Sequence, residues 1–136
     1  MQQKHLVYEP SEHEIQTAIL HYLQLQGIKA IRSNSGMIST ETRGRRRMIR
    51  LAPVGTPDIL GCLPNGRFLA IEVKRPKNGP TFWQKESLAE YIQLGAIAFV
   101  ARSVDDVKNR LDQEDAKSCT CDCPSCMTCA KSKAWQ

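Results

Sequence analysis

The 136-residue sequence predicts an α/β fold, a mixed β-sheet flanked by helices in the order α-β-β-β-β-α-β-α. A short apolar run between Gly66 and Pro76 is typical of a buried central strand. A second apolar run, residues 96–100, follows a helical segment, and a helical crossover between two strands of one sheet makes them parallel. Near the N-terminus, apolar residues at helical spacing predict an amphipathic helix. We therefore expect one domain with a single core.

The first helix is expected to begin after Ser11, a good N-cap, and to stop at Gly27. Its apolar positions at helical spacing are Ile15, Ala18, Ile19, Tyr22 and Leu23. The next segments are a strand, a surface loop rich in Ser, Thr, Asn and Gly, and a second strand, at residues 28–32, 33–44 and 45–51.

Two carboxylates and a lysine are expected to meet at the end of the central strand. Asp58 opens a short apolar run, residues 59–63, and the turn at residues 63–67 joins this run to the central strand as a hairpin. The hairpin brings Asp58 back beside Glu72. Because side chains alternate along a strand, Glu72 and Lys74 project from the same face. Such charges are costly to bury unpaired, so the cluster suits a divalent cation and a water molecule.

After the central strand, the sequence predicts a linker, a helix, a strand and a last helix, at residues 76–80, 81–94, 96–100 and 103–111. Thr81 is the expected N-cap of the first of these helices, and Gly95 its stop. Ser103 and Asp106 have the spacing of a capping box, which would open the second.

The charge of the chain is unevenly distributed. Residues 1–111 contain 16 Lys and Arg against 10 Asp and Glu, a net charge of +6, whereas the remaining tail has 3 against 4, or −1. A basic domain points to a polyanionic partner. No stretch approaches a membrane span, and the first five residues lack the apolar core of a signal peptide. We therefore expect a cytoplasmic protein that does not contact a membrane.

The string Pro57-Asp58, thirteen residues, then Glu72-Val73-Lys74 is the pattern of the PD-(D/E)XK nuclease superfamily. With its flanking residues and the later Gln84, the chain resembles the VRR-NUC family of that superfamily from about Ser11 to Leu111. The resemblance implies a restriction-endonuclease-like fold. It also divides the chain into an N-terminal extension, a nuclease domain and a Cys-rich tail, at residues 1–10, 11–111 and 112–136.

The resemblance further implies a function. Stand-alone VRR-NUC proteins are small, often phage-encoded nucleases, and some resolve four-way (Holliday) junctions as homodimers. A small domain with a single site needs a dimer to cut two strands symmetrically. We therefore expect an Mg- or Mn-dependent DNA endonuclease that acts as a homodimer on branched or duplex DNA. The alternatives are a nicking or restriction-type nuclease, and a non-catalytic DNA-binding module with a metal-binding cysteine tail.

Phosphodiester hydrolysis needs an activated water and neutralised charge on the phosphate, which divalent metal ions can provide. Asp58 and Glu72 supply the oxygen ligands that such ions prefer, and Lys74 would orient the water and counter negative charge. By the resemblance, the backbone carbonyl of Val73 is a further metal ligand and Gln84 contacts the active site. The alternative for Gln84 is a solvated helix glutamine.

Many relatives add a carboxylate from the first helix, and here Glu12 and Glu14 compete for that role. Ser11 and Glu14 have the spacing of a capping box, which gives Glu14 a purely structural task. Glu12 falls on the side of Ile15 and Ile19, the inward stripe of the helix. The geometry therefore favours Glu12 as the metal ligand.

Five arginines lie within eight residues: Arg43, Arg45, Arg46, Arg47 and Arg50. Arginine is the preferred fork for phosphate oxygens, so we expect these side chains to bind the DNA backbone, with Arg75 and Lys77 extending the track. A solvated charged face is the alternative. Phe82 and Trp83 are expected to pack in the core or at a dimer contact rather than to stack on bases.

The C-terminal tail is rich in cysteine: Cys119, Cys121, Cys123, Cys126 and Cys129, with Cys62 standing alone in a strand. Disulfides are not expected in a cytoplasmic chain. Four thiolates could hold a zinc ion, but their spacing lacks the long loop of a zinc ribbon. A reduced tail without metal is the alternative.

Overall fold

The computed structural model describes residues 8–118, and the chain divides into two compact units, one up to Val104 and one from Asp105 onward. The elements in chain order are α1 (Glu12–Leu25), β1 (Lys29–Arg32), β2 (Met37–Thr42), β3 (Arg45–Arg50), β4 (Ile59–Cys62), β5 (Phe68–Val73), α2 (Phe82–Gln93), β6 (Ile97–Ala101) and α3 (Val104–Ser118). The predicted mixed α/β class is confirmed. No helix in this part of the chain is long and apolar enough to span a bilayer.

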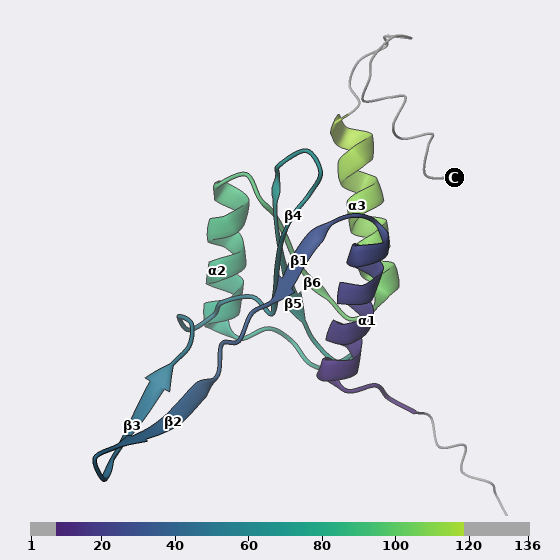
Figure 1. Cartoon of the computed structure of the whole chain (residues 1–136). Helices are drawn as coiled ribbons and strands as arrows, with labels where there is room; N and C mark the ends of the chain where they lie inside the picture. The colour runs from purple at the N-terminus through teal and green to yellow at the C-terminus, as the bar shows by residue number, and fades with distance from the viewer. Residues whose placement is uncertain (1–7, 119–136) are drawn as a thin grey trace, which may run out of the picture. The chain divides into compact units, whose positions relative to one another are not determined.

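The main sheet of the first unit has four strands in the order β1-β4-β5-β6. β4 is antiparallel to both β1 and β5, and β6 is parallel to β5, as the helical crossover through α2 predicts. β5 is central, and every residue from Leu69 to Val73 is buried. The helices α1 and α2 lie on opposite sides of this sheet (Figure 1).

The two faces of β5 have different coverings. On the α2 side, Ala70 of β5 and Ala98 of β6 form a buried cluster with Leu88 of α2. The small alanine side chains let the helix lie close to the strands. On the other side, α1 contributes its buried stripe of Ile15, Ile19 and Leu23. Each large apolar side chain that is fully buried stabilises the fold by about 1.5–3 kcal/mol.

Both helices of the first unit begin with a capping box. In α1, the Ser11 hydroxyl accepts from the Glu14 backbone N–H, and the Glu14 carboxylate accepts from the Ser11 backbone N–H. Thr81 and Gln84 exchange the same pair of bonds at the start of α2. These bonds satisfy backbone donors that a helix N-terminus otherwise leaves free.

The expectation of a surface loop over residues 33–44 is wrong. This segment contains β2, which pairs with β3 in a separate two-stranded sheet and takes no part in the main one. A strand at residues 45–51 was expected, and β3 is present there. It pairs with β2 and is not a strand of the main sheet. The element order therefore has one more strand than predicted. β2 is polar and almost fully exposed, so it lacks the apolar alternation by which a half-buried strand is recognised.

The last helix also differs from the prediction. It was expected to end at Leu111, whereas α3 continues to Ser118. The expected boundary between the nuclease domain and the tail therefore falls inside α3. The cysteines from Cys119 onward lie outside the described residues.

The loop between β3 and β4 comes very close to the first turn of α2. Gly55 has a φ of +85°, and a Cβ built on it would lie 2.4 Å from the backbone oxygen of Trp83. Only glycine allows this approach, because it tolerates the left-handed conformation and leaves room for the carbonyl. The contact fixes the segment that leads into Asp58 against the helix that carries Gln84.

We expect Gly55→Ala to destabilise the protein by about 2 kcal/mol or more, because it combines an unfavourable positive φ with a clash against backbone. Gly36→Ala is the matched control, since a Cβ there meets nothing within 4 Å. Urea unfolding of both variants measures the difference. Equal stability of the two variants would contradict the close approach.

Candidate active site

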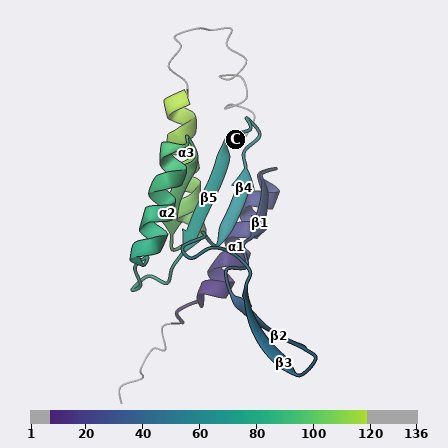
Figure 2. The same ribbon diagram turned by 90° about the vertical axis from the view of Figure 1, so that its left-hand side faces the viewer.

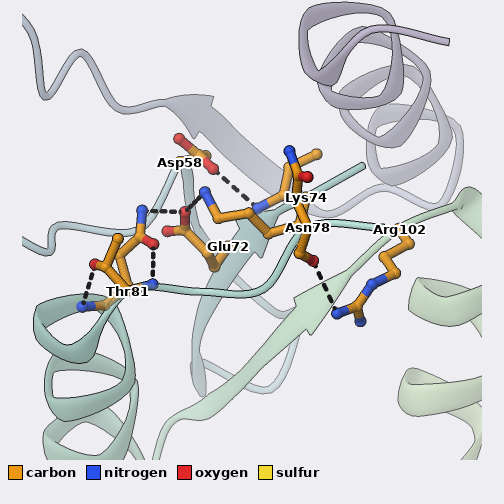
Figure 3. Close-up of polar contacts among 8 residues, drawn as sticks. Asp58, Glu72, Lys74, Asn78, Thr81 and Arg102 are labelled. Atoms are coloured by element: carbon orange, nitrogen blue, oxygen red, sulfur yellow. Dashed lines mark hydrogen bonds and ion pairs between the residues drawn. The ribbon is translucent and has the colours of Figure 1, made fainter. Parts of the chain in front are cut away.

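Asp58 lies directly before β4 and is held from two sides. Its backbone oxygen accepts from Ser33 N–H at 2.7 Å, which continues the β1–β4 ladder by one residue. Its side-chain Oδ2 accepts from the backbone N–H of Val73 at 2.9 Å. The carboxylate therefore points from the start of β4 toward the end of the adjacent strand β5 (Figure 3).

Pro57 lies opposite Val73, where the β4–β5 ladder ends. The β4–β5 register pairs Ile59 with Ile71, so two further steps set Pro57 opposite Val73. Proline has no N–H and cannot donate to the Val73 carbonyl. The ladder ends here: the Asp58 carboxylate accepts from the Val73 N–H, and Pro57 offers no donor to the Val73 oxygen.

Glu72 is the buried centre of the cluster, with a side-chain exposure of 0%. Its Oε1 accepts from Lys74 Nζ at 2.7 Å and from Gln84 Nε2 at 2.5 Å. Its Oε2 is buried and has no hydrogen-bond partner among the described residues. Native proteins rarely leave such an atom unpaired, and each case calls for an explanation such as an ion or a catalytic role.

Gln84 links the start of α2 to this carboxylate. Its Oε1 accepts from Thr81 N–H at 2.8 Å, within the capping box, while its Nε2 donates to Glu72. The amide group of Gln84 thus accepts through its oxygen and donates through its nitrogen. The bond to the helix cap fixes the direction in which the nitrogen donates. The alternative of a freely solvated glutamine is therefore wrong. The T-x-x-Q spacing was a readable sign of this cap.

Burial raises the pKa of Glu72 to about 7, because removal from water disfavours the charged form. The hydrogen bond from Lys74 lowers this pKa, and the neighbouring negative charge of Asp58 raises it. For Lys74, burial by itself lowers the pKa, but the hydrogen bond and charge of Glu72, with the charges of Glu12 and Asp58, outweigh it and raise the pKa. Lys74 therefore stays protonated, and Glu72 changes charge near neutral pH.

Glu12 and Glu14 occupy different environments. Glu14 serves the capping box and also accepts from the Tyr8 hydroxyl, and these hydrogen bonds lower its pKa to about 2. Glu12 is half-buried, and its charge acts on Lys74. Of the two, Glu12 is the carboxylate that faces the cluster, as the helical geometry favoured.

The carboxylates of Asp58, Glu72 and Glu12 are the candidate ligands for a divalent cation. Within residues 8–118, no three His, Cys, Asp or Glu side chains are close enough to share one ion, so Glu12 does not complete a carboxylate triad with Asp58 and Glu72. The Asp58 and Glu72 carboxylates nevertheless interact, and the buried Oε2 of Glu72 has no hydrogen-bond partner among these residues. These are oxygen donors of the kind that Mg²⁺ and Mn²⁺ prefer.

The basic residues fall into two groups. Arg43 and the four arginines of β3 lie on the β2–β3 hairpin. This hairpin is distant from Glu72 in sequence and is not part of the main sheet. Arg75 and Lys77 follow β5, but both face Glu9, at 3.8 Å and 2.6 Å. These two cations are therefore already partly neutralised. Sequence reasoning missed Glu9 because it lies 68 positions from Lys77.

Of the two expected roles of Phe82 and Trp83, packing in the core is wrong, whereas a dimer contact stays a prediction. Their side chains are 65% and 60% exposed, and they contact each other edge to face at 5.3 Å. The loop after β5 has a contact that sequence reasoning also missed: Arg102 Nη2 donates to the Asn78 carbonyl at 3.1 Å (Figure 3). Cys62 is a free, exposed thiol. The predicted zinc site on the tail cysteines lies beyond the described part of the chain.

Comparison of the chain with family models, with curated proteins and with solved structures finds no match. The argument for function therefore depends on the residues and their geometry.

In metal-free buffer, the titration of Glu72 should make stability fall as pH rises from about 4.5 to about 7. Its pKa is raised in the folded state above the ordinary value of 4.5, so in this window the folded state binds more protons than the unfolded state. The contribution is fully present below the unfolded pKa and is lost as pH rises through the folded pKa. Its size is about 3 kcal/mol.

Glu72→Gln removes this titration. The free energy of unfolding of the variant should therefore rise relative to that of the unmodified protein as pH increases from about 4.5 to about 7. Urea unfolding in a chelator at a series of pH values measures the difference. Parallel curves for the two proteins would show that burial does not raise this pKa.

Proposed function

We propose that this protein is a metal-dependent DNA endonuclease of the VRR-NUC type, with the restriction-endonuclease-like core of the PD-(D/E)XK superfamily. The observation that carries the proposal is the convergence of Asp58, Glu72 and Lys74 at one end of a buried central strand, with one Glu72 oxygen unpaired. A purely structural ion pair would not require that oxygen to remain unsatisfied. Two carboxylates beside a lysine are the groups that phosphodiester hydrolysis uses.

Asp58, Glu72 and the Val73 carbonyl would hold an Mg²⁺ or Mn²⁺ ion. When bound, the ion supplies Lewis-acid activation and neutralises charge on the phosphate. It also favours the ionised form of Glu72, which burial alone disfavours. Gln84 keeps one Glu72 oxygen in place, so that the other remains directed to the ion.

Lys74 then acts on the substrate. Its side chain is 12% exposed and its ammonium group lies 2.7 Å from Glu72 Oε1, so the carboxylate positions the ammonium group. It would donate to a phosphate oxygen and orient the attacking water, and its raised pKa keeps it cationic at neutral pH. Charge stabilisation of this kind is often the largest contribution to catalysis.

The partner we propose is DNA, either branched or duplex. The net charge of +6 over residues 1–111 and the arginines of the hairpin support a polyanion. Four-way junctions are the narrower substrate, cut symmetrically by a homodimer in which each copy carries one site. The exposed Phe82 and Trp83 beside Gln84 support a dimer contact at this end of α2.

Asp58→Asn, Glu72→Gln and Lys74→Ala should each reduce cleavage at least about 100-fold, because each removes a group that acts on charge in the transition state. The assay uses purified protein with duplex, flap and four-way-junction DNA in Mg²⁺ or Mn²⁺. Glu86→Gln, an exposed carboxylate on α2, is the control and should retain activity. Cleavage at the normal rate by Glu72→Gln would refute the assigned site, and DNA binding without cleavage by the unmodified protein would make the chain a binding module.

Glu12→Ala and Glu14→Ala should separate catalysis from helix capping. Glu12→Ala removes a charge that acts on Lys74, so cleavage and metal affinity should fall while the thermal midpoint changes little. Glu14→Ala breaks the capping box and should cost about 1 kcal/mol of stability, with cleavage retained. Activity and thermal unfolding are measured for both variants. An inactive but fully stable Glu14→Ala protein would reverse the assignment.

A further inference from the structure

The β2–β3 hairpin stands apart from the rest of the first unit in both views (Figures 1 and 2). β2 and β3 pair only with each other, and every residue of β3 is exposed. A lone two-stranded hairpin is at best marginally stable in water, since neither face is covered. We therefore expect the exposed hairpin to bind a partner.

The register distributes the arginines over both faces of the hairpin. Residues directly opposite each other on antiparallel strands point to the same side, and neighbours along a strand point to opposite sides. Arg45 and Arg47 therefore lie on one face, opposite Thr42 and Thr40. Arg46 and Arg50 lie on the other, opposite Glu41 and Met37. Each face carries two arginines, and Arg43 lies at the tip.

These cations have no partner within the described chain. No side chain of the five arginines forms a hydrogen bond or ion pair there, and Glu41 does not bridge to Arg46 across the ladder. Residues 37–50 contain five arginines and one acidic residue, a net charge of +4. The core of a protein–protein interface is depleted of charge, so a second copy of this chain suits these faces less well than a polyanion does.

The tip adds an independent observation. Arg43 has a φ of +52° and Gly44 a φ of +71°, so both central residues of the turn are left-handed. Asn, Asp and Gly are the residues that such a turn prefers, and Arg43 is the one non-glycine residue with positive φ in the described chain. A strained arginine at the end of an exposed arm indicates that its charge is used there.

We propose that the hairpin enters the major groove of a DNA duplex tip first, so that its two faces contact phosphates of the opposite strands. The major groove is about 12 Å wide and admits a two-stranded ribbon, and both of its walls carry phosphates. Arg45 and Arg47 contact one wall, Arg46 and Arg50 the other, and Arg43 the floor. The phosphate contacts on the two walls position the duplex beside the site, and they do not fix a base sequence. The inference rests on the proposed function and specifies how that substrate is held.

The test measures DNA affinity as a function of salt in a chelator, so that binding is read without cleavage. The variants are Arg45→Ser/Arg47→Ser for one face and Arg46→Ser/Arg50→Ser for the other, with Lys29→Ser/Lys108→Ser as a charge-matched control outside the hairpin. Each face variant should flatten the slope of log K against log salt by about two, since each lost phosphate contact contributes about 0.9. The control should keep the slope of the unmodified protein.

Arg43→Asn separates charge from folding. Asparagine suits the left-handed conformation, so thermal stability should be equal or higher. DNA affinity should fall with little change in the salt slope, because the groove floor carries base edges and not phosphates. Methylation of guanine N7 with dimethyl sulfate reports major-groove occupancy, and its protection by the unmodified protein should be lost with both face variants.

Each other outcome has a definite meaning. A slope change for one face only would overturn groove insertion, because the hairpin would then lie flat on the backbone. Normal slopes for both face variants would overturn any role of the hairpin while leaving the nuclease proposal intact. Dissociation of a dimer by the face variants, seen in sedimentation, would make a second copy the occupant. Absence of DNA binding by the unmodified protein would instead refute the proposed function.

Discussion

A buried carboxylate with one paired and one unpaired oxygen is the constraint on which the site depends. Glu72 is on the central strand, where neighbouring strands and α2 exclude water. An unsatisfied buried acceptor costs about 1–3 kcal/mol, and the fold tolerates this at a position where valine or leucine would pack well. The surrounding residues reduce the cost on one oxygen only, through Lys74 and Gln84. The other oxygen has no hydrogen-bond partner among the described residues.

The chain holds this carboxylate by combining local and distant interactions. The β4–β5 ladder ends at Pro57, and the Val73 N–H donates to the Asp58 side chain. Gly55 lets the same loop touch the backbone of Trp83, and the next residue in α2 donates to Glu72. The segment before Asp58 and the start of α2 are thus one connected support. A shift in either would move both ends of the cluster.

The carboxylate cluster and the arginine-rich hairpin lie in parts of the fold that differ in burial. The cluster lies on buried strands, whereas the arginines lie on an exposed hairpin without a core of its own. The cations nearest the cluster, Arg75 and Lys77, are paired with Glu9. A polyanion that approaches the site therefore meets its freest positive charge on the hairpin, and it must compete with Glu9 for the two cations next to β5.

The sequence by itself determined the features that depend on a few neighbouring residues. The capping box at Ser11, the turn before β5 and the crossover through α2 each follow from local signals, and they are enough to bring Asp58 beside Glu72. Only the tertiary structure decided that Phe82 is exposed and that Lys77 meets Glu9, since burial and ion pairing depend on segments far apart in the chain. The same holds for β2, where polar residues form a strand because β3 folds back on them and no apolar face is required. Local patterns specify backbone conformation and register, whereas exposure and charge pairing are properties of the assembled chain.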